Sequence, residues 1–543
     1  MYYATPGREL IETLIFMQAA LKNLVQEAYH QKVRDRDGLH LLKNRFAVQH
    51  KTGFPSNAEL IQAYRDLIAQ GVLPEDRDFM KVLRKRSVRS LSGIASITVI
   101  TKAYPCPGKC IFCPTEPEMP KSYLSNEPAI MRAILNNFDA YQQTRNRLTS
   151  LSKTGHKTNK IDVIVSGGTF SFYPHRYQTD FTRGIFNALN GGRKSRSLEE
   201  AQRINETAEN RCIGLSFETR PDHITEPELR RLRRLGCTKI EIGVQSLNDK
   251  VLELNKRGHG IAETKRALQL IRDAAYKVNC HMMPNLYGST PEIDYQDMVE
   301  LFSNPAYRPD WLKIYPTMVV PWSQLEGIWK KGLHVPYTDE DLVDLLVKVK
   351  QVIPEYTRIT RLYRDIPATT ITAGSKISNL RQMIQDKMKL LGVTCRCIRC
   401  REIKDEKVRF DDLTLNVKEF AASEGQEFFI TFDDMKRDRL SSLLRLRFSS
   451  YSLNGKKHFM KELEGAALVR EVHTYGEQVE ISTKERSASQ HIGLGRRMMQ
   501  KAEEIALNNG YKKLAVISGI GVREYYRKLG YELDGTYMIK KLA

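Results

Sequence analysis

The sequence predicts an α/β protein in which a partly closed barrel of parallel strands is preceded by a helical module and followed by an α+β domain. Short apolar strands alternate with helical patterns from about residue 94 to 370, which is the order of parallel βα units. Segments of alternating polarity after residue 405 indicate antiparallel strands, and residues 8–32 carry apolar side chains at helical spacing. We therefore divide the chain into residues 1–90, 91–375, 376–405 and 406–543.

Each element follows from a local pattern. Apolar spacing predicts helices over residues 8–32 and 56–71, and Thr225 to Glu228 forms a capping box for a helix that ends at Gly236. The strands predicted in the barrel are 94–101, 161–165, 212–217, 239–244, 278–284, 311–318 and 357–363. The other helices predicted there are 261–276, one opened by residues 290–292, and 339–352. The last part is predicted to hold strands 427–432, 444–448, 467–475 and 513–518, with a helix after residue 493.

Size and charge limit the class of protein. A chain of 543 residues can bury several cores, and its 9 cysteines fall mainly in two tight clusters, as expected for metal sites in a reducing cytoplasm. No apolar run is long enough to span a bilayer, and the N-terminus lacks a secretory segment, so we expect a cytoplasmic protein without a membrane partner. The net charge of +21 favours a nucleic-acid partner, the alternative being a merely basic surface. Basic residues gather at 81–89, 230–234 and 396–401.

Three cysteines at Cys-x3-Cys-x2-Cys spacing lie in a loop rich in Pro and Gly. Because these residues cannot continue a helix, the chain folds back and the three sulfurs can converge. A [4Fe–4S] cluster takes four ligands, so three thiolates leave one iron open. A structural zinc loop is the alternative, but no fourth Cys or His stands within the loop. We expect Cys106, Cys110 and Cys113 to hold a [4Fe–4S] cluster, at a spacing that resembles that of radical S-adenosylmethionine (SAM) enzymes.

Polar and glycine residues follow three successive predicted strands. Two glycines after the strand at 161–165 let a ligand approach the backbone, although Thr169 stands where many radical SAM enzymes carry glutamate. On the next strand, Glu218 is suited to ribose hydroxyls and Arg220 to the methionine carboxylate. Each residue alone is equally well explained as part of a turn or a buried polar group, but together they favour a SAM site. The candidates are Gly167, Gly168, Thr169, Glu218, Arg220 and Gln245.

A second cluster, Cys395, Cys397 and Cys400, places three thiols within six residues. This density favours a structural metal ion, with zinc as the candidate, although a tetrahedral site needs a fourth ligand that the sequence does not name. The alternative is a set of free thiols beside arginines that contact phosphate.

A glycine-rich turn near the C-terminus precedes a predicted helix. In the run from Gln490 to Arg496, Gly493 and Gly495 let backbone amides at a helix start hold a pyrophosphate. The pattern resembles the Gln/Arg-x-x-Gly-x-Gly motif of Gcn5-related acetyltransferases (GNAT). Residues 523–531 match the segment in which such folds place a tyrosine near the thioester sulfur, a core aromatic being the alternative.

A radical SAM core joined to an acetyltransferase in one basic chain resembles the catalytic (third) subunit of Elongator and its single-chain bacterial and archaeal relatives. The match runs nearly the whole length, and Gly-Gly-Thr in place of Gly-Gly-Glu is the pattern of this family. It rests on the segments 166–170, 217–222, 243–246, 364–367, 470–473, 515–519 and 530–535.

The resemblance implies carboxymethylation at C5 of the wobble uridine, number 34, in the anticodon loop of tRNA. A 5′-deoxyadenosyl radical from SAM would take hydrogen from the acetyl methyl of acetyl-CoA. The resulting carbon radical would add to the uracil, and thioester hydrolysis would leave a carboxymethyl group. A homodimer or association with Elongator-like partner subunits stays open. The second hypothesis is a protein lysine acetyltransferase with a structural radical SAM domain; a radical SAM methyl- or methylthiotransferase of tRNA and a non-catalytic tRNA-binding module are further alternatives.

The resemblance also assigns residues by motif. It implies a cluster on the three loop cysteines and an acetyl-CoA contact at Lys160. The residues expected to pair with the pantetheine arm are Glu471, Val472, His473 and Thr474. The pyrophosphate loop would comprise Leu494, Gly495 and Arg496, after Gln490 and Gly493. The candidate catalytic residues are Tyr526, near the thioester, with Tyr525 and Lys160.

Overall fold

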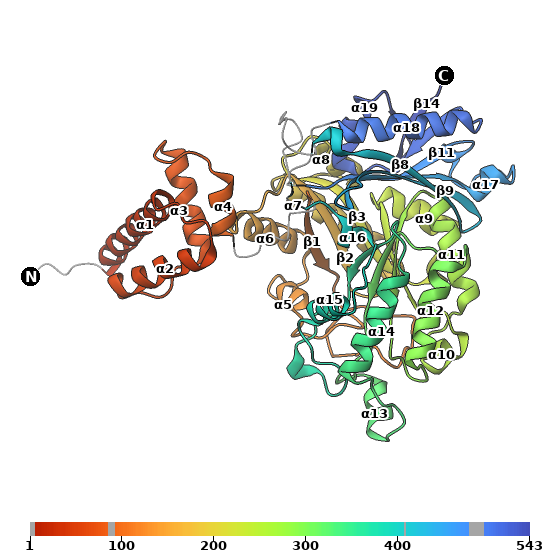
Figure 1. Cartoon of the computed structure of the whole chain (residues 1–543), viewed down its shortest axis with the longest axis horizontal. Coiled ribbons are helices and arrows are strands. Elements are labelled where there is room, and N and C mark those ends of the chain that lie inside the picture. Colours follow the sequence, from red (N-terminus) through yellow and green to blue (C-terminus); the bar gives the residue numbers. More distant parts are fainter. Residues whose placement is uncertain (1–5, 85–92, 405, 407–408, 477–492) are drawn as a thin grey trace, which may run out of the picture. The chain divides into compact units, whose positions relative to one another are not determined.

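The computed structural model describes residues 6–84, 93–404, 406, 409–476 and 493–543 (Figure 1). Contacts divide the chain into two compact units. The first comprises Met1–Leu91 with Asn146–Thr158, and the second comprises Ser92–Arg145 with Asn159–Ala543.

The first unit is helical, as predicted. The helix predicted at 56–71 is α3, which opens with a capping box in which the Glu59 amide donates to Ser56 Oγ at 3.2 Å. Its core packs Leu24, Leu60, Tyr64 and Phe79. Two helices that the sequence analysis did not predict, α2 and α4, complete it. The bounds are α1 Pro6–His30, α2 Arg36–His50, α3 Asn57–Ala69 and α4 Arg77–Leu83.

The second unit begins with a seven-stranded parallel sheet in the order β1-β2-β3-β4-β5-β6-β7, which forms the predicted partial barrel. All seven predicted strands are present, because their runs of Ile, Val and Leu suit a parallel sheet buried on both faces; the first six positions of β4 are all buried. The strands are β1 Ala95–Ile100, β2 Lys160–Ser166, β3 Arg211–Thr219, β4 Lys239–Gln245, β5 Lys277–Met282, β6 Trp311–Ile314 and β7 Arg358–Arg361. The helices are α5 Pro128–Ile134, α7 His175–Leu189, α8 Leu198–Asn205, α9 Glu226–Arg234, α10 Asp249–Leu254, α11 Ile261–Asp273, α12 Pro291–Ser303, α13 Gln324–Lys330, α14 Asp339–Val352, α15 Leu380–Leu390 and α16 Ile398–Arg401. Helix α6, Ala140–Lys153, begins in this unit, and its part from Asn146 onward belongs to the first.

A mixed sheet follows in the order β13-β14-β12-β11-β10-β9-β8. Its neighbours are antiparallel except for β11 and β12, which pair in parallel over residues 467–469. Helix α18 packs Met498, Met499 and Ala502 against the sheet. The bounds are β8 Thr414–Ala422, β9 Gly425–Asp434, β10 Arg439–Phe448, α17 Ser450–Leu453, β11 Ala467–Thr474, α18 Leu494–Asn508, β12 Lys513–Val516, α19 Arg523–Arg527, β13 Glu532–Asp534 and β14 Tyr537–Lys541.

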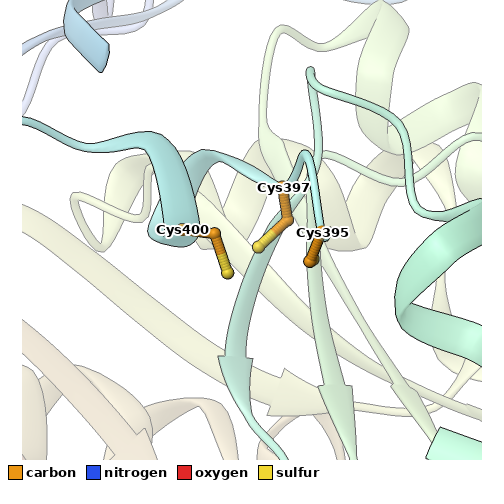
Figure 2. Close-up of side chains that lie close together, drawn as sticks. All are labelled: Cys395, Cys397 and Cys400. Atoms are coloured by element: carbon orange, nitrogen blue, oxygen red, sulfur yellow. The ribbon is translucent and has the colours of Figure 1, made fainter. Parts of the chain in front are cut away.

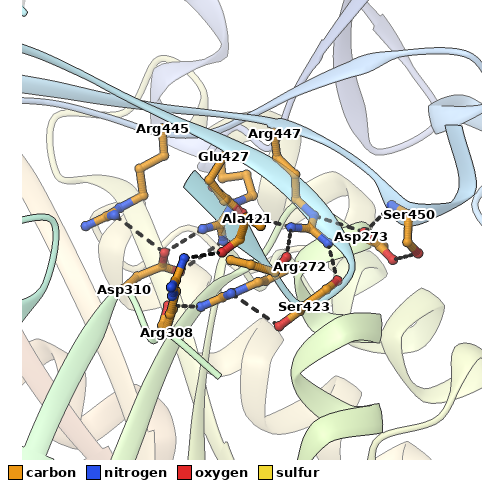
Figure 3. Close-up of polar contacts among 12 residues, drawn as sticks. Arg272, Asp273, Arg308, Asp310, Ala421, Ser423, Glu427, Arg445, Arg447 and Ser450 are labelled. Carbon is orange, nitrogen blue, oxygen red and sulfur yellow. Dashed lines mark hydrogen bonds and ion pairs between the residues drawn. The ribbon is translucent and has the colours of Figure 1, made fainter. Parts of the chain in front are cut away.

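A buried ion network joins this mixed sheet to the partial barrel of strands β1–β7, which we call the half-barrel (Figure 3). The Arg447 side chain of β10 is fully buried; its Nη2 binds Asp273, at the end of α11, at 2.6 Å. Arg447 Nη1 also binds Glu427 of β9 at 3.1 Å, while the Ser450 hydroxyl donates to Asp273 at 2.5 Å. Because Asp273 belongs to the half-barrel and Arg447 to the mixed sheet, this contact fixes one sheet to the other.

The same network continues through Asp310, which precedes β6. Arg470 of β11 donates from Nη1 to Asp310 at 2.9 Å and from Nε to Glu427 at 3.2 Å. Burial alone would raise the pKa of Asp310, but Arg470, Arg445 and Arg272 outweigh it and hold that pKa well below its usual range. Such a network stabilises only while every buried charge keeps its partner.

Replacing Arg447 by methionine should therefore lower the free energy of unfolding by about 3–5 kcal/mol, because Asp273 and Glu427 would stay buried without this cation. Urea denaturation of the full chain measures the change. Arg409→Met is the control, since the Arg409–Asp411 pair is 82% exposed on both sides and such pairs contribute less than about 1 kcal/mol. Equal losses in the two variants would contradict the role given to Arg447.

Candidate active site

The cysteine loop lies beside the carboxyl ends of the half-barrel strands. Cys110 is buried and hydrogen-bonds Cys113, whereas the Cys106 sulfur lies 3.6 Å from Thr169 Oγ1, after β2. The Ile111 amide fixes the loop by donating to Asn255 O at 3.2 Å. The structure thus brings all three predicted ligands to the end of the sheet that carries the candidate SAM residues.

Two guanidinium groups face the Cys110 sulfur. Arg257 Nη1 lies 3.3 Å from it, and Arg220 Nη1 lies 3.9 Å from it. The hydrogen bond from Cys113, followed by the charges of Arg257 and Arg220, lowers the pKa of Cys110 to about 5 despite its burial. Sequence reasoning missed Arg257, because it lies between α10 and α11 rather than at a strand end.

The loop fits an iron–sulfur cluster. Its donors are three soft thiols, and two nearby cations offset the negative charge that such a cluster brings. Unlike the second cysteine group, the three sulfurs do not all lie within 4.8 Å of one another, as suits a cluster of several metal atoms better than a single ion. The backbone must also pass close to Arg220, because a Cβ on Gly108 would lie 2.1 Å from its Nη1.

The glycines after β2 and the end of β4 have the features of a ligand site. Gly167 has φ 139°, and a Cβ there would lie 1.9 Å from Thr101 Oγ1. Gly168 has φ 99°. Gln245 adopts φ 78°, which is strained for a residue with a side chain, and its buried Oε1 accepts no hydrogen bond within the described part of the chain. Buried acceptors normally have a hydrogen-bond donor, and a bound ligand would supply the donor that Gln245 Oε1 lacks.

The structure gives Glu218 and Arg220 partners of their own. Glu218 Oε2 accepts from the Tyr123 hydroxyl at 2.7 Å, and Glu218 Oε1 lies 3.8 Å from Lys313 Nζ. Arg220 binds Asp222 through Nε and Nη2, each at 2.9 Å. Only Nη1 of Arg220 points toward the cysteine loop, so Asp222 competes with the ligand carboxylate that the sequence analysis expected there.

A row of charged residues crosses the sheet from β3 to β6, a feature that the sequence analysis missed. Glu218 pairs in register with Glu241, and His281 with Lys313. Glu241 accepts from His281 at 3.1 Å and binds Lys313; burial would raise the pKa of Glu241, but Lys313, His281 and Lys239 hold it well below its usual range. Barrel interiors are normally filled by branched apolar side chains, so a row of charged residues departs from the usual filling.

The sequence of β4 carries a local pattern that indicates this charged row, because Lys239 and Glu241 alternate there with isoleucine. Glu218, Glu241 and His281 lie within 4.8 Å of one another, but Lys313 already supplies a positive charge to both carboxylates.

At the start of α18, Gly493 adopts φ 78° as the N-cap, followed by buried Leu494. A Cβ on Gly495 would lie 2.7 Å from the Tyr525 hydroxyl, which is buried and has no hydrogen-bond partner among the described residues. Burial raises the pKa of Tyr525 to about 12, while the charge of Arg496 opposes the shift. Gln490 lies outside the described residues.

Of the two candidate tyrosines, Tyr526 packs in the core of the mixed sheet at 6% exposure. Tyr525 is the one whose hydroxyl faces the glycine turn.

The predicted pantetheine strand is the part of β11 beyond its pairing with β12, which ends at Val469. The residues concerned are Glu471, Val472, His473 and Thr474. The Glu471 carboxylate binds Arg445 at 2.9 Å and lies 3.8 Å from Lys277, the first residue of β5. Burial would raise the pKa of Glu471, but Lys277 and Arg445 lower it to about 2. The Glu471 side chain therefore holds β11 against the half-barrel.

Lys160 is the first residue of β2, at the opposite end from Gly167. It is in register with Arg211 of β3, and a Cβ on Gly521, just before α19, would lie 2.4 Å from the Arg211 Cβ. The candidate residues thus form two groups, one at each end of the half-barrel. A strand of 7 residues spans roughly 20 Å.

The second cysteine group converges tightly (Figure 2). The sulfurs of Cys395, Cys397 and Cys400 lie within 4.8 Å of one another, and Cys397 is fully buried. Hydrogen bonds from Cys395 and Cys400 hold the pKa of Cys397 well below its usual range. No fourth Cys, His, Asp or Glu atom joins this group within the described ranges.

The arginines beside these thiols are engaged with protein groups. Arg401 binds Asp433 at 2.5 Å, and Arg396 lies 3.3 Å from Asp438. Arg399 donates to Thr360 O at 3.1 Å. These contacts favour a metal site over a phosphate site here.

The basic segment at 230–234 also has internal partners. Arg233 is buried and donates to Ser518 O at 2.8 Å, while Arg231 binds Glu228. This segment therefore joins the half-barrel to the mixed sheet, a role that the sequence did not reveal. Residues 85–89 lie outside the described part. No helix within the described ranges is long and apolar enough to cross a membrane.

Comparison with known families agrees with this geometry. The model of the radical SAM superfamily matches residues 100–301, and that of the Radical_SAM C-terminal domain matches residues 309–390. The half-barrel and its cysteine loop therefore define a radical SAM protein.

Relatives extend the match to the mixed sheet. The chain is 40% identical over 543 residues to the tRNA uridine(34) acetyltransferase of Methanocaldococcus infernus, covering 97% of this chain and 99% of that one. It is 38% identical over 539 residues to Elongator complex protein 3 of Danio rerio, covering 96% of each. The solved structure of the archaeal Methanocaldococcus infernus Elp3 with an N-terminal deletion matches at a TM-score of 0.73 and 40% identity, over 83% of this chain and 100% of that one. The chain belongs to the family of tRNA uridine(34) acetyltransferases and Elongator complex protein 3.

The cysteine loop predicts an oxygen-sensitive chromophore. Protein purified without oxygen and reconstituted with iron and sulfide should absorb broadly in the visible range, and Cys113→Ser should lose most of this absorbance and iron. Cys212→Ser is the control, because that buried thiol donates to Gly214 O at 3.4 Å, away from the loop. Folded wild-type protein that takes up no iron would contradict the prediction.

The second cysteine group predicts zinc that stays bound through purification. Elemental analysis should find it in the wild type, and Cys397→Ser should lose it with a lower melting temperature, because structural zinc contributes folding free energy. Cys280→Ser, at a buried thiol outside both groups, should keep its zinc. Full zinc retention by Cys397→Ser would overturn this interpretation.

Proposed function

We propose that this protein is a tRNA uridine(34) acetyltransferase that installs a carboxymethyl group at C5 of the wobble uridine, using SAM and acetyl-CoA. One observation carries the proposal: a cysteine loop backed by Arg257 and a glycine turn facing Tyr525 occur within one compact unit. The identity of 40% over nearly the full length to tRNA uridine(34) acetyltransferases supports it.

Each group of residues has a task in this reaction. Cys106, Cys110 and Cys113 would hold the cluster, with Arg257 and Arg220 offsetting its charge. With one electron from the reduced cluster, bound SAM would supply a carbon radical strong enough to take hydrogen from an acetyl methyl, which no side chain is basic enough to deprotonate. The backbone around Gly167 and the free acceptor of Gln245 would hold SAM at the same end.

The mixed sheet would hold acetyl-CoA as a GNAT domain does. Amides at the start of α18, after Gly493, suit the pyrophosphate, and β11 suits pairing with the pantetheine arm. The Tyr525 hydroxyl, which lies against Gly495 of the same turn, would donate to the bound acetyl-CoA. Lys160 lies on the strand end facing this part of the molecule.

The tRNA substrate fits the charge and the chemistry. The net charge of +21 favours a phosphate backbone, and an anticodon loop can unstack the target base. The charged row that includes Lys313 offers hydrogen-bonding groups in the half-barrel. Zinc at the second cysteine group would fix the segment between the two sheets.

Reconstitution tests the function. Wild-type protein given SAM, reductant, tRNA and acetyl-CoA labelled in the acetyl group should place the label in a carboxymethyl-type uridine, found by nucleoside mass spectrometry. Cys110→Ser should abolish labelling, and Tyr525→Phe should lower its rate by on the order of tenfold or more, because one hydrogen-bond donor is lost. Label on protein lysines with none in tRNA would instead support a lysine acetyltransferase.

A further inference from the structure

The helix that carries both candidate tyrosines is too short to hold itself in place. Helix α19 has 5 residues, and isolated helices of that length are unstable in water. The position of the Tyr525 hydroxyl over the glycine turn of α18 therefore depends on what anchors α19 from outside.

One carboxylate of the half-barrel holds this helix at both ends. Glu206, directly after α8, accepts from Arg523 at 2.9 Å through Oε1 and from Arg527 at 2.7 Å through Oε2. The two arginines are four residues apart and so share one face of the helix. Tyr525 lies midway between them, and its hydroxyl faces Gly495 instead.

The burial of these groups gives the contact its strength. Glu206 is 8% exposed and Arg523 is 7% exposed. Burial lowers the pKa of Arg523, while its hydrogen bond to Glu206 opposes that shift. The attraction within an ion pair that is buried away from water is stronger than within an exposed pair. Removing one partner leaves the other charge buried without a counter-charge.

Other contacts hold the chain just before α19, independently of Glu206. A Cβ on Gly519 would lie 2.1 Å from Ile213 O, so the backbone here passes directly against β3. Arg233 donates to Ser518 O at 2.8 Å. The interface between the half-barrel and this segment thus survives loss of Glu206, whereas α19 keeps Tyr526 in the core but loses the ion pairs at its first and last residues.

We propose that Glu206 is a positioning residue for the acetyl site: by binding Arg523 and Arg527, this residue of the half-barrel fixes the position of the Tyr525 hydroxyl. This rests on the proposed function. It makes the acetyl site of the mixed sheet dependent on a carboxylate outside that sheet, because the Tyr525 hydroxyl lies against Gly495 at the start of α18.

Glu206→Gln tests the proposal, because glutamine keeps the volume and removes the charge. We expect kcat for CoA release from acetyl-CoA, measured with SAM, reductant and tRNA, to fall by on the order of tenfold or more, and KM for acetyl-CoA to rise, because Tyr525 lies at the glycine turn. Formation of 5′-deoxyadenosine from SAM without acetyl-CoA should stay at the wild-type rate.

Two variants accompany it. Glu524→Gln is the matched control, because Glu524 also pairs with Arg527 but lies within α19 at 41% side-chain exposure, and it should leave kcat unchanged. Arg527→Gln removes only the more exposed of the two arginine contacts and should give an intermediate loss of kcat.

The outcomes separate this proposal from the proposed function. Wild-type protein that neither releases CoA nor modifies tRNA would refute the proposed function itself. Normal wild-type turnover with equal kcat in Glu206→Gln and Glu524→Gln would overturn the role of Glu206 alone. Parallel loss of CoA release and 5′-deoxyadenosine formation in Glu206→Gln would show general loosening of the fold, and would also overturn that role.

Discussion

The contact between Arg447 and the two carboxylates of Asp273 and Glu427 is the constraint on which the arrangement of the second unit depends. Three charges are removed from water at the meeting of two sheets, and Arg470 extends the pattern to Asp310. Such groups tolerate burial only in an arrangement that satisfies all of them. The network therefore selects one relative placement of the half-barrel and the mixed sheet.

In this arrangement, the strands of the half-barrel separate the cysteine loop from the mixed sheet. Their carboxyl ends meet the cysteine loop, and Arg257 reaches the Cys110 sulfur there. Their amino ends meet the mixed sheet, where Lys277 approaches Glu471 and Arg211 lies against Gly521. Charged side chains such as Glu241 and Lys313 line the same sheet, although parallel strands usually carry apolar ones.

Much of the fold was predictable because its strands are short apolar runs, and all seven strands of the half-barrel were placed. Helix α7 was missed although Phe181, Ile185 and Leu189 repeat at helical spacing, so its signal was available. Strand β8 was missed because it is largely exposed on both faces, and an edge strand of that kind lacks a clear polarity pattern.

The residues of the candidate site likewise divide into those that the sequence predicted and those that only the fold reveals. Cysteine spacing and glycine turns are local signals, so Cys106 and Gly493 were identified from the sequence. Arg257 and Glu206 were missed, because their roles depend on contacts between distant segments. Arg233 was assigned to a nucleic-acid surface from its neighbours in sequence, whereas the fold buries it between the two sheets.

The placement of the candidate groups at opposite ends of β2 also bears on the choice of acetyl donor. A strand length of roughly 20 Å separates Lys160 from Gly167, so a donor fixed at one end by its phosphates needs a long, pliable tether to present its methyl group at the other. The phosphopantetheine chain of coenzyme A is such a tether, whereas compact activated acetates such as acetyl phosphate have none. For the proposed reaction, the architecture itself discriminates among metabolites that carry the same two carbons.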